Sequence, residues 1–363
     1  MKLQVTQENL NQALSSIGRI ANSRNTLPIL SNVLIKTSNN RLSLTATNLD
    51  IAIVHYIGAK ISEEGAITVP ARLMQDFIGS LPQSVIDLEL TNTKLKITTD
   101  KYHSIINGII ADDFPVMPTI KDAKNIKLNN GLLKKALNQT VFAASSDEAR
   151  QVLTGVYLHT KDDKLFIAAT DSFRLAEKEL GKNNQQIAIL IPATAMQELL
   201  RVTPDQEGEV VISYNEQQVL FQTGDIELTA RLIEGNYPDY QKLIPTIFNS
   251  SIQLKRNDLI NITKVSNLFA KESAGSVTIE LDEKTNKLSI NSIASQIGEN
   301  NATAEGKVIG GGSITINSRY LLDVLSVLNG DEVYFGFNGK LEPTIIKDPK
   351  DPSYKHIIMP LKS

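Results

Sequence analysis

Hydrophobic residues recur along this chain with two different periods. Residues 7–22 carry apolar side chains at the spacing of an amphipathic helix, at Leu10, Leu14, Ile17 and Ile20. Residues 31–58 instead alternate between apolar and polar positions, which is typical of half-buried antiparallel strands. The chain therefore begins with a helix followed by a sheet.

The same two periods continue to the end of the chain. Helical spacing predicts six helices, at residues 7–22, 70–81, 129–145, 192–203, 255–270 and 317–329. The second of these is expected to begin at Pro70, because the first helical turn does not need the N–H that proline lacks. Strand-like alternation fills the segments between them, so the pattern predicts an α+β protein.

Similar segments recur about every 123 residues. RLSLTATNLDIAI starts at Arg41, KLFIAATDSFRLA at Lys164 and a fainter KLSINSIASQIGE at Lys287. The helix starts VPARLMQDFI, IPATAMQELL and INSRYLLDVL recur in the same order. Three copies of one unit explain this order, each with two helices and seven or eight strands. Proline-containing linkers at 111–125 and 236–249 predict domains at 1–122, 123–246 and 247–363.

Composition excludes several classes of protein. The 363 residues are 41% hydrophobic and 21% charged, with no run of eighteen apolar residues and no apolar leader after Met1. We therefore expect neither a membrane span nor a secreted protein. The chain contains no cysteine, which excludes disulfides, thiolate metal sites and cysteine nucleophiles. A cytoplasmic protein is the expectation.

The sequence contains no recognisable catalytic site. Its four histidines stand apart without metal-ligand spacing, and the HExxH, GxxxxGK[ST], GxSxG and GxGxxG motifs are absent. The glycine run at 310–313 could hold a phosphate, but a flexible turn is favoured. Asp112 and Asp113 could hold a divalent cation, but a polar linker is favoured. We expect no enzyme activity, no cofactor and no metal.

Charge is distributed unevenly between the predicted helices and the rest of the chain. The formal net charge is −3, from 37 basic and 40 acidic residues. The six predicted helices carry +4 and the remaining residues carry −7. On its own such a bias favours an ordinary solvated helix face, and a helical surface that meets nucleic acid is the alternative.

Taken together, several motifs resemble one known family, the β subunit of bacterial DNA polymerase III, which is a sliding clamp. The resemblance covers the whole chain in order, and the segments that carry it are TLPILSN at 26–32, TATNLDI at 45–51, VPAR at 69–72, DDFP at 112–115, AATDSFRLA at 168–176, NYPDY at 236–240, RYLLDVL at 319–325 and MPLKS at 359–363. No single segment is specific by itself, but the ordered set is.

The resemblance implies a fold and a function. Such clamps have the DNA clamp fold, with three similar domains of two helices and antiparallel sheets, and two chains pair head-to-tail into a ring. The implied role is that of a non-catalytic processivity factor that encircles double-stranded DNA without reading its sequence. The implied partners are a second copy of the chain, the catalytic subunit of DNA polymerase III, the clamp loader complex, and other polymerases and repair proteins that carry a short clamp-binding peptide.

The resemblance also implies site residues. The candidates for contact with DNA are Arg24, Arg72, Lys134, Lys135, Arg150, Gln151, Arg201 and Lys264. Asp147, at a position that touches DNA in the family, is acidic here, which puts its contact in doubt. The family's apolar pocket for client peptides corresponds to Leu153, Thr170, Ser172, Phe173, Arg174, Leu175, Pro238, Lys242, Leu243, Asn317, Tyr320, Leu341, Pro343, Met359, Pro360 and Leu361.

Some of these positions depart from the family pattern. Phe173 replaces a residue that is commonly histidine and Lys242 one that is commonly arginine, so peptide preference is expected to differ slightly. The joint between two chains is expected to involve Leu268, Phe269 and Ile106. Ser104 stands where the family usually has an aromatic residue, which predicts a weaker or differently packed joint.

Two other classes of protein stay open at this point. A hydrolase or transferase with an unrecognised site would turn over nucleotides or esters. A repetitive β-rich interaction protein of a cell surface would not be retained on circular DNA. The absence of any nucleophile–base spacing counts against the first class, and the absence of an apolar leader counts against the second.

Overall fold

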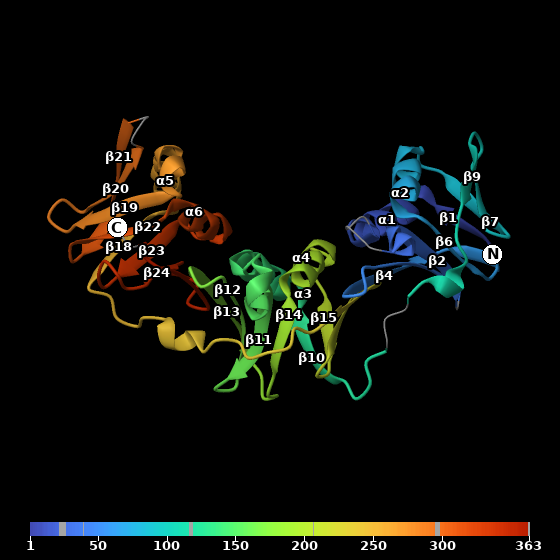
Figure 1. Ribbon diagram of the computed structural model, residues 1–363, viewed down its shortest axis with the longest axis horizontal. Coiled ribbons are helices and arrows are strands. Elements are labelled where there is room, and N and C mark those ends of the chain that lie inside the picture. Colours follow the sequence, from blue (N-terminus) through green and yellow to red (C-terminus); the bar gives the residue numbers. More distant parts are fainter. Residues whose placement is uncertain (22–26, 39, 116–118, 206, 295–297, 362–363) are drawn as a thin grey trace. The chain divides into compact units, whose positions relative to one another are not determined.

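The computed structural model describes residues 1–21, 27–38, 40–115, 119–205, 207–294 and 298–361. Within these residues the chain has six α-helices and twenty-five strands, in three successive sets of strands and two helices (Figure 1). The first set contains nine strands and the others eight each, against the seven or eight expected. No helix in this described part is long and apolar enough to cross a membrane.

The helices lie close to their predicted positions: α1 at Gln7–Ala21, α2 at Ala71–Ser80, α3 at Asn130–Thr140, α4 at Ala193–Val202, α5 at Arg256–Phe269 and α6 at Ser318–Val327. Two boundaries were wrong. Pro70 precedes α2 as the last residue of a strand, with ψ of 116°, rather than occupying the first helical turn. The third helix ends at Thr140 and continues as a 3-10 turn at Val141–Ala143, instead of reaching residue 145.

The chain divides into two compact units by its internal contacts. Unit 1 comprises residues 1–133 and 197–232, and unit 2 comprises residues 134–196 and 233–363. This division cuts through the second set of elements, because each half of that set shares a sheet with a neighbouring set. The domain limits at 122 and 246 stay predictions.

Unit 1 contains two antiparallel sheets. One has the strand order β5-β1-β7-β8-β9, formed by Lys60–Glu63, Lys2–Thr6, Val85–Thr91, Lys94–Thr98 and His103–Asn107. The other has the order β10-β15-β16-β17-β4-β3-β2-β6, formed by Lys124–Asn129, Glu209–Tyr214, Gln218–Thr223, Ile226–Arg231, Ile51–Gly58, Arg41–Thr47, Asn32–Ser38 and Ala66–Pro70. The second sheet is continuous from the first to the second set through the β17–β4 pair.

Unit 2 contains one continuous sheet of twelve strands, in the order β14-β11-β12-β13-β25-β24-β23-β18-β21-β20-β19-β22. These are Ala188–Pro192, Gly155–Lys161, Lys164–Thr170, Arg174–Lys182, Tyr354–Ile358, Thr344–Lys347, Glu332–Phe337, Ser250–Lys255, Gly298–Ile309, Lys287–Ala294, Ser276–Asp282 and Gly312–Asn317. The β13–β25 pair joins the second set to the third, as β17–β4 joins the first to the second.

Alternation along the strands separates two faces of the sheet in unit 1. Along β4, Ile51, Ile53 and His55 are buried on the face that meets α1, where His55 Nδ1 lies 2.8 Å from Ser16 Oγ. The residues between them point to the opposite face. Helix α1 therefore covers one face of these strands, and described residues of the following segment, among them Phe114 and Ile120, lie against the other face.

The repeat found in the sequence extends to single hydrogen bonds. In the turn after β3, Thr47 Oγ1 donates to the Ile51 carbonyl at 2.9 Å, and Leu49 has a φ of 80°. In the turn after β12, Thr170 Oγ1 donates to the Arg174 carbonyl at 2.6 Å, and Ser172 has a φ of 76°. The two turns are 123 residues apart and share the same unusual backbone, which confirms the duplication.

Candidate functional site

The β13–β25 pair brings predicted pocket residues of the second and third sets together. Arg174 lies opposite Ile358 in the register, and the Met359 N–H donates to the Phe173 carbonyl at 2.8 Å. The C-terminal tail continues to β22, where the Leu361 N–H donates to the Thr315 carbonyl at 2.8 Å. Residues 170–175 and 358–361 therefore form one neighbourhood inside unit 2.

The turn between β12 and β13 holds Phe173 outward. Asp171 Oδ1 accepts hydrogen bonds from the backbone N–H groups of Phe173 and Arg174, each at 2.9 Å. The Ser172 N–H donates to Thr170 Oγ1 at 3.1 Å. With its backbone fixed in this way, the Phe173 ring is 53% exposed and available to a partner.

Arg174 connects the turn between β12 and β13 to neighbouring elements. Its Nε donates to Asp171 Oδ2 at 3.1 Å, Nη1 to Asp323 Oδ2 at 2.5 Å and Nη2 to the Phe142 carbonyl at 2.7 Å. The guanidinium also lies 4.5 Å from the centre of the Tyr320 ring. Because these contacts use all three nitrogens, Arg174 fixes the turn relative to α6. Sequence reasoning missed Asp171, Phe142 and Asp323.

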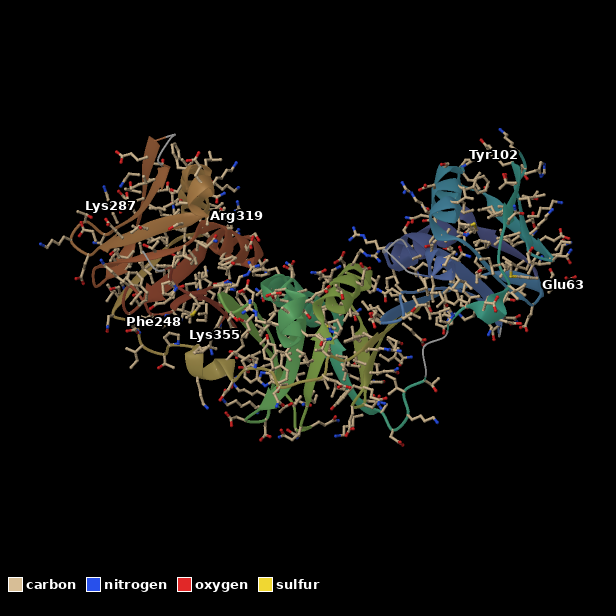
Figure 2. The ribbon with its side chains drawn as sticks, in the orientation of Figure 1. Glu63, Tyr102, Phe248, Lys287, Arg319 and Lys355 are labelled. Atoms are coloured by element: carbon tan, nitrogen blue, oxygen red, sulfur yellow. The ribbon has the colours of Figure 1, made fainter. Side chains whose placement is uncertain are left out.

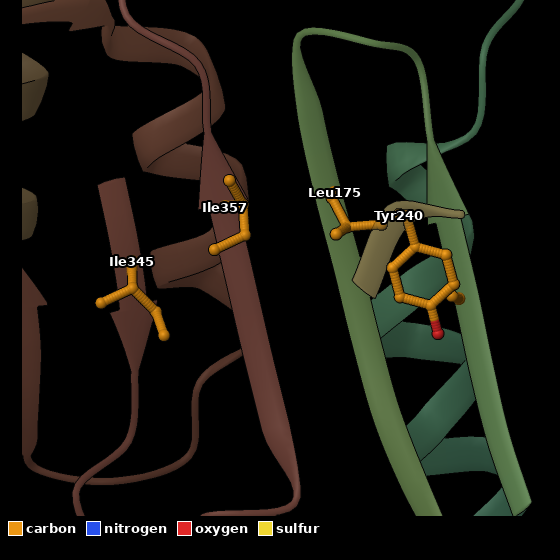
Figure 3. Packing of buried hydrophobic residues seen from close by; sticks show 5 residues of the cluster. Leu175, Tyr240, Ile345 and Ile357 are labelled. Atoms are coloured by element: carbon orange, nitrogen blue, oxygen red, sulfur yellow. The ribbon is translucent and has the colours of Figure 1, made fainter. Parts of the chain in front are cut away.

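A buried apolar cluster supports the turn from the other side (Figure 3). Leu175 on β13, Ile345 on β24 and Ile357 on β25 pack with Ala168 and with Tyr240 of the segment that connects the second and third sets. Tyr240 is 3% exposed, and its hydroxyl lies 2.7 Å from His159 Nε2. Of these only Leu175 was predicted for the site. The aromatic pair in the NYPDY segment was the available signal for Tyr240.

Several large apolar residues of unit 2 are exposed. Leu243 is 55% and Leu341 is 71% exposed, and Ile247, which the sequence analysis missed, is 76% exposed. Phe248 of the same connecting segment, labelled in Figure 2, packs edge-on against Tyr334 with ring centres 6.1 Å apart. Such exposed apolar residues are typical of a surface that binds a peptide.

The remaining predicted pocket residues have mixed roles. Tyr320, Pro343, Met359, Pro360 and Leu361 are half-buried, and Pro238 is exposed. Leu153 is only 5% exposed, within the 3-10 segment Glu148–Thr154. Lys242 pairs with Asp239 at 2.7 Å, and the Asn317 side chain caps α6 by accepting from the Arg319 N–H at 2.9 Å. The side chains of Lys242 and Asn317 therefore make contacts within their own local segments.

A buried ion cluster also lies in unit 2. Lys178, with a side chain 2% exposed, donates to Asp351 Oδ2 at 2.8 Å, and Lys135 donates to the same oxygen at 2.8 Å. Burial by itself would raise the pKa of the Asp351 carboxyl, but the hydrogen bonds from both lysines and from Ser353 outweigh it and hold the pKa well below its ordinary value. Lys135, a predicted DNA contact, is thus engaged within the protein.

His356 provides a test of pH dependence in unit 2. Its ring is fully buried and stacks on Phe142, and burial followed by the charge of Arg174 lowers its pKa to about 3. A histidine that is neutral when folded and titrates near 6.5 when unfolded stabilises the fold fully above pH 6.5 and progressively less as the pH falls towards 3. We expect the free energy of unfolding to fall by about 2 kcal/mol more between pH 7.5 and 5.0 in the wild type than in His356→Phe.

Urea unfolding followed by tyrosine fluorescence at the two pH values measures this difference. Equal changes in the wild type and in His356→Phe would show that His356 does not contribute.

Some of the residues predicted to contact DNA are exposed, and others are engaged within the protein. Arg72 on α2, with a side chain 85% exposed, and Lys264 on α5 are exposed, as is Gln151. Arg150 pairs with Asp147 at 3.5 Å and donates to Ser172 Oγ at 3.0 Å, while its side chain stays 43% exposed. Lys134 is half-buried, and Arg24 lies outside the described residues.

Arg201 is occupied within unit 1. Its Nη1 donates to the Ser15 carbonyl at 3.0 Å, its Nη2 donates to the Ser16 carbonyl, and its Nε donates to Glu198 Oε2 at 2.9 Å. These bonds tie α4 to α1. Arg201 therefore supports the helices, where the sequence analysis expected it to contact a ligand.

The residues predicted for the joint between chains lie on β9 and at the end of α5. Leu268 is 58% exposed and Phe269 is half-buried. Ile106 is only 5% exposed, because alternation on β9 turns it towards Leu95 of its own sheet, whereas Ile105 is 64% exposed. β9 is an edge strand with β8 as its one neighbour in the described part of the sheet.

The described side chains offer no cluster of three or more histidine, aspartate or glutamate residues that could hold a metal ion. His159 is bonded to Tyr240, and His55 is bonded to Ser16. Burial lowers the pKa of both histidines. Both are packed in the interior of their units.

Models of one protein family match nearly the whole chain. The N-terminal domain of the DNA polymerase III beta subunit matches residues 1–118, the central domain residues 127–239 and the C-terminal domain residues 241–362. Among curated proteins, the beta sliding clamp of Synechocystis sp. is 33% identical, with 100% of this chain and 99% of that protein covered. The beta sliding clamp of Bacillus subtilis is 30% identical, with both proteins fully covered.

Solved structures agree with these matches. The crystal structure of the Bacillus subtilis DNA polymerase sliding clamp superposes with a TM-score of 0.94 at 28% identity, covering 100% of this chain and 99% of that one. That of the Pseudomonas aeruginosa sliding clamp bound to griselimycin gives a TM-score of 0.95 at 26% identity, with both chains fully covered. The chain belongs to the family of DNA polymerase III β subunits, the β sliding clamps.

Proposed function

We infer that this protein is a DNA sliding clamp, the processivity factor of DNA polymerase III, and that it works as a head-to-tail homodimer closed around duplex DNA. The observation that carries this conclusion is the match to all three domains of the family in order, over the full chain. The protein is a non-catalytic subunit. Its partners are DNA, a second copy of itself, the polymerase, the clamp loader complex and other clients that carry a clamp-binding peptide.

Charge explains why such a protein would hold DNA by topology. Two chains together carry a formal charge of −6, twice the −3 of one chain. Net electrostatic attraction to the phosphate backbone is therefore weak and is screened by salt. A closed ring retains DNA without strong contacts, and contacts with phosphates alone permit sliding because they read no base sequence.

The joints inside the chain indicate how the ring closes. At each internal joint an edge strand of one set pairs with a strand of the neighbouring set, β17 with β4 and β25 with β13. β9 holds the place in the first set that β17 and β25 hold in theirs, so its edge is available to a second chain. Leu268 and Phe269 would pack beside that edge together with the exposed Ile105, whereas Ile106, which the sequence predicts for the joint, faces its own sheet. Pairing the edge also protects it from aggregation.

We assign the contacts with DNA to the basic side chains that stay exposed. Arg72 and Lys264 are the strongest candidates, with Arg150 and Gln151 beside them, and Arg24 and Lys134 are kept from the sequence analysis. Lys135 and Arg201 are assigned a secondary role, because their side chains already bind Asp351 and the α1 carbonyls. The proposed contacts involve phosphates, not bases.

We place the client-peptide site on the neighbourhood of the β13–β25 pair. Phe173, Leu243 and Leu341 offer exposed apolar surface there. Arg174 holds the turn, and the cluster around Tyr240 supports it from within. Short peptides with apolar anchors suit a surface of this kind.

The variant Phe173→Ala tests whether loading on DNA and binding of a client peptide depend on different residues. The variant is expected to load on primed circular DNA as the wild type does, but to bind a client peptide about tenfold more weakly and to shorten the products of the polymerase, because an exposed aromatic anchor is lost. Fluorescence anisotropy with a labelled polymerase peptide and a primer-extension assay measure the two effects.

The matched control for this variant is Ile309→Ala, which removes an exposed apolar side chain, 55% exposed, elsewhere in unit 2. It should match the wild type in both assays. Unchanged peptide affinity in Phe173→Ala would remove Phe173 from the site. Failure of the wild-type protein to lengthen polymerase products in the presence of a loader would contradict the proposed function itself.

We further propose a cytoplasmic location, since the partners in DNA replication are there, and three domains at 1–122, 123–246 and 247–363. The family-domain matches at 1–118, 127–239 and 241–362 support these limits.

A further inference from the structure

One hydrogen bond joins a proposed DNA contact to the proposed client-peptide site. Arg150 Nη1 donates to Ser172 Oγ at 3.0 Å. Arg150 belongs to the 3-10 segment Glu148–Thr154, and Ser172 belongs to the turn between β12 and β13 that presents Phe173. Both residues lie in unit 2. A side chain proposed to meet a phosphate of DNA therefore touches the turn proposed to meet a peptide.

The same stretch of chain is attached to this turn at a second point. Arg174 Nη2 donates to the Phe142 carbonyl at 2.7 Å. Between the two points of attachment, the Ser145 N–H donates to the Leu153 carbonyl at 2.8 Å, and Leu153 is buried. Because residues 142–154 are closed on themselves and hold the turn at both ends, the stretch and the turn form one connected body.

Asp147 holds Arg150 from the other side. Its Oδ2 lies 3.5 Å from Arg150 Nε, and its Oδ1 accepts a hydrogen bond from the Ala149 N–H at 3.1 Å. The Arg150 side chain is still 43% exposed, and these contacts leave other N–H groups of the guanidinium for a ligand. A guanidinium binds phosphate oxygens through a planar fork of donors. Arg150 can therefore bind a phosphate while its bond to Ser172 stays closed.

Binding at either site would then order the same residues. A phosphate that holds Arg150 keeps its bond to Ser172 closed, and a peptide that packs on Phe173 keeps Ser172 in place for Arg150. Ordering a long, exposed side chain and a turn costs conformational entropy. The first ligand to bind meets that cost, so the second ligand binds more tightly. Linkage requires this effect to be equal in both directions.

We propose that duplex DNA and client peptides bind this protein cooperatively, through the contact between Arg150 and Ser172. The inference rests on the proposed function as a sliding clamp and adds a coupling between its two binding sites. Ser172 is a positioning residue for Arg150, and so is Asp147, whose acidic side chain departs from the family pattern. A clamp closed around DNA would hold its clients more tightly than a free one.

The test compares peptide affinity on and off DNA. The full-length protein is loaded on a nicked circle by a clamp loader and separated from the loader and from free protein by gel filtration. Fluorescence anisotropy then gives the affinity of loaded and of free protein for a labelled polymerase peptide. We expect the gain in affinity on loading to be about fivefold larger in the wild type than in Ser172→Ala. Repulsion between DNA and an acidic peptide affects both proteins alike and cancels in this comparison.

Arg150→Lys is the second variant, and it serves if Ser172→Ala does not fold. It keeps the positive charge, but a lysine amine lacks the planar fork that reaches a phosphate and Ser172 together. It should therefore lose the extra gain, as Ser172→Ala does. The matched control is Lys284→Ala, which removes a positive charge from an exposed position between β19 and β20 and should keep the wild-type gain.

Hydrogen exchange follows the order of the turn itself. The Ser172 N–H is bonded to Thr170 Oγ1 and the Phe173 N–H to Asp171 Oδ1. Both amides should exchange more slowly in the loaded wild type than in the free protein, because ordering of the turn suppresses local opening. This slowing should be absent in Arg150→Lys.

The outcomes separate this inference from the proposed function. Equal gains in the wild type and in Ser172→Ala, or a full gain in Arg150→Lys, would overturn the coupling and leave the sliding clamp intact. Loss of the gain in Lys284→Ala would show that overall charge carries the effect, which would also overturn it. Failure of the wild type to load or to bind the peptide would instead contradict the proposed function.

Discussion

Arg174→Ala is expected to lower the free energy of unfolding of unit 2 by about 3 kcal/mol, the largest effect of any single truncation in the proposed client-peptide site. The substitution leaves Asp171 with its two backbone donors but without its charged partner, and it removes donors from Asp323 and from the Phe142 carbonyl. Asp171 is the more costly loss, because its side chain is only 13% exposed. Urea unfolding followed by tyrosine fluorescence measures the change, since the chain has no tryptophan.

The matched control is Arg319→Ala, which truncates an exposed arginine on the same helix that carries Tyr320. It should change the free energy of unfolding by less than about 0.5 kcal/mol. If Arg174→Ala were as mild as this control, the turn would be held by Asp171 and Thr170 alone, and the role given to Arg174 would be wrong.

Leu268→Glu is expected to weaken the association of two chains by about a hundredfold, roughly 2.7 kcal/mol. The side chain is 58% exposed in the single chain, and the proposed joint would bury it against the β9 edge. A carboxylate placed there loses its water without gaining a partner. Sedimentation velocity over a dilution series measures the dissociation constant.

Leu341→Glu introduces the same charge on a residue that is 71% exposed and was placed in the proposed client-peptide site. It should dimerise like the wild type and lose peptide binding instead. A dimer of normal strength in Leu268→Glu would place the joint elsewhere. The same series tests whether Ser104 weakens the wild-type joint relative to other clamps.

Much of the fold could be predicted because the signals are local and repeated. The apolar spacing of residues 7–22 is enough to locate α1, and the recurrence of Thr47 and Thr170 in similar segments indicates two copies of one turn. The errors lie at helix boundaries, where one residue decides whether the helix or the strand continues. Pro70 was placed inside α2, but the strand β6 extends through it by pairing with Asn32.

The site was harder to predict because the sequence does not show which partner a charged residue will find. Lys135 and Arg201 are basic residues on predicted helices, as DNA contacts are expected to be. Lys135 instead binds Asp351, 216 residues away, and Arg201 binds carbonyls of α1, about 185 residues away. Arg174 was predicted for the client-peptide site, but the sequence does not show that its three acceptors come from separate elements. Such networks depend on tertiary packing that no local pattern contains.

Release from cut DNA is the most direct test of a protein that holds DNA by encircling it. The protein is loaded on a nicked circle by a clamp loader, separated from free protein by gel filtration at high salt, and followed after a restriction enzyme cuts the circle once. A topological clamp stays on the intact circle, because its weak contacts do not matter there, and is lost once the circle is linear. Protein that stays on the linear DNA, or that high salt removes from the intact circle, would contradict retention by a closed ring.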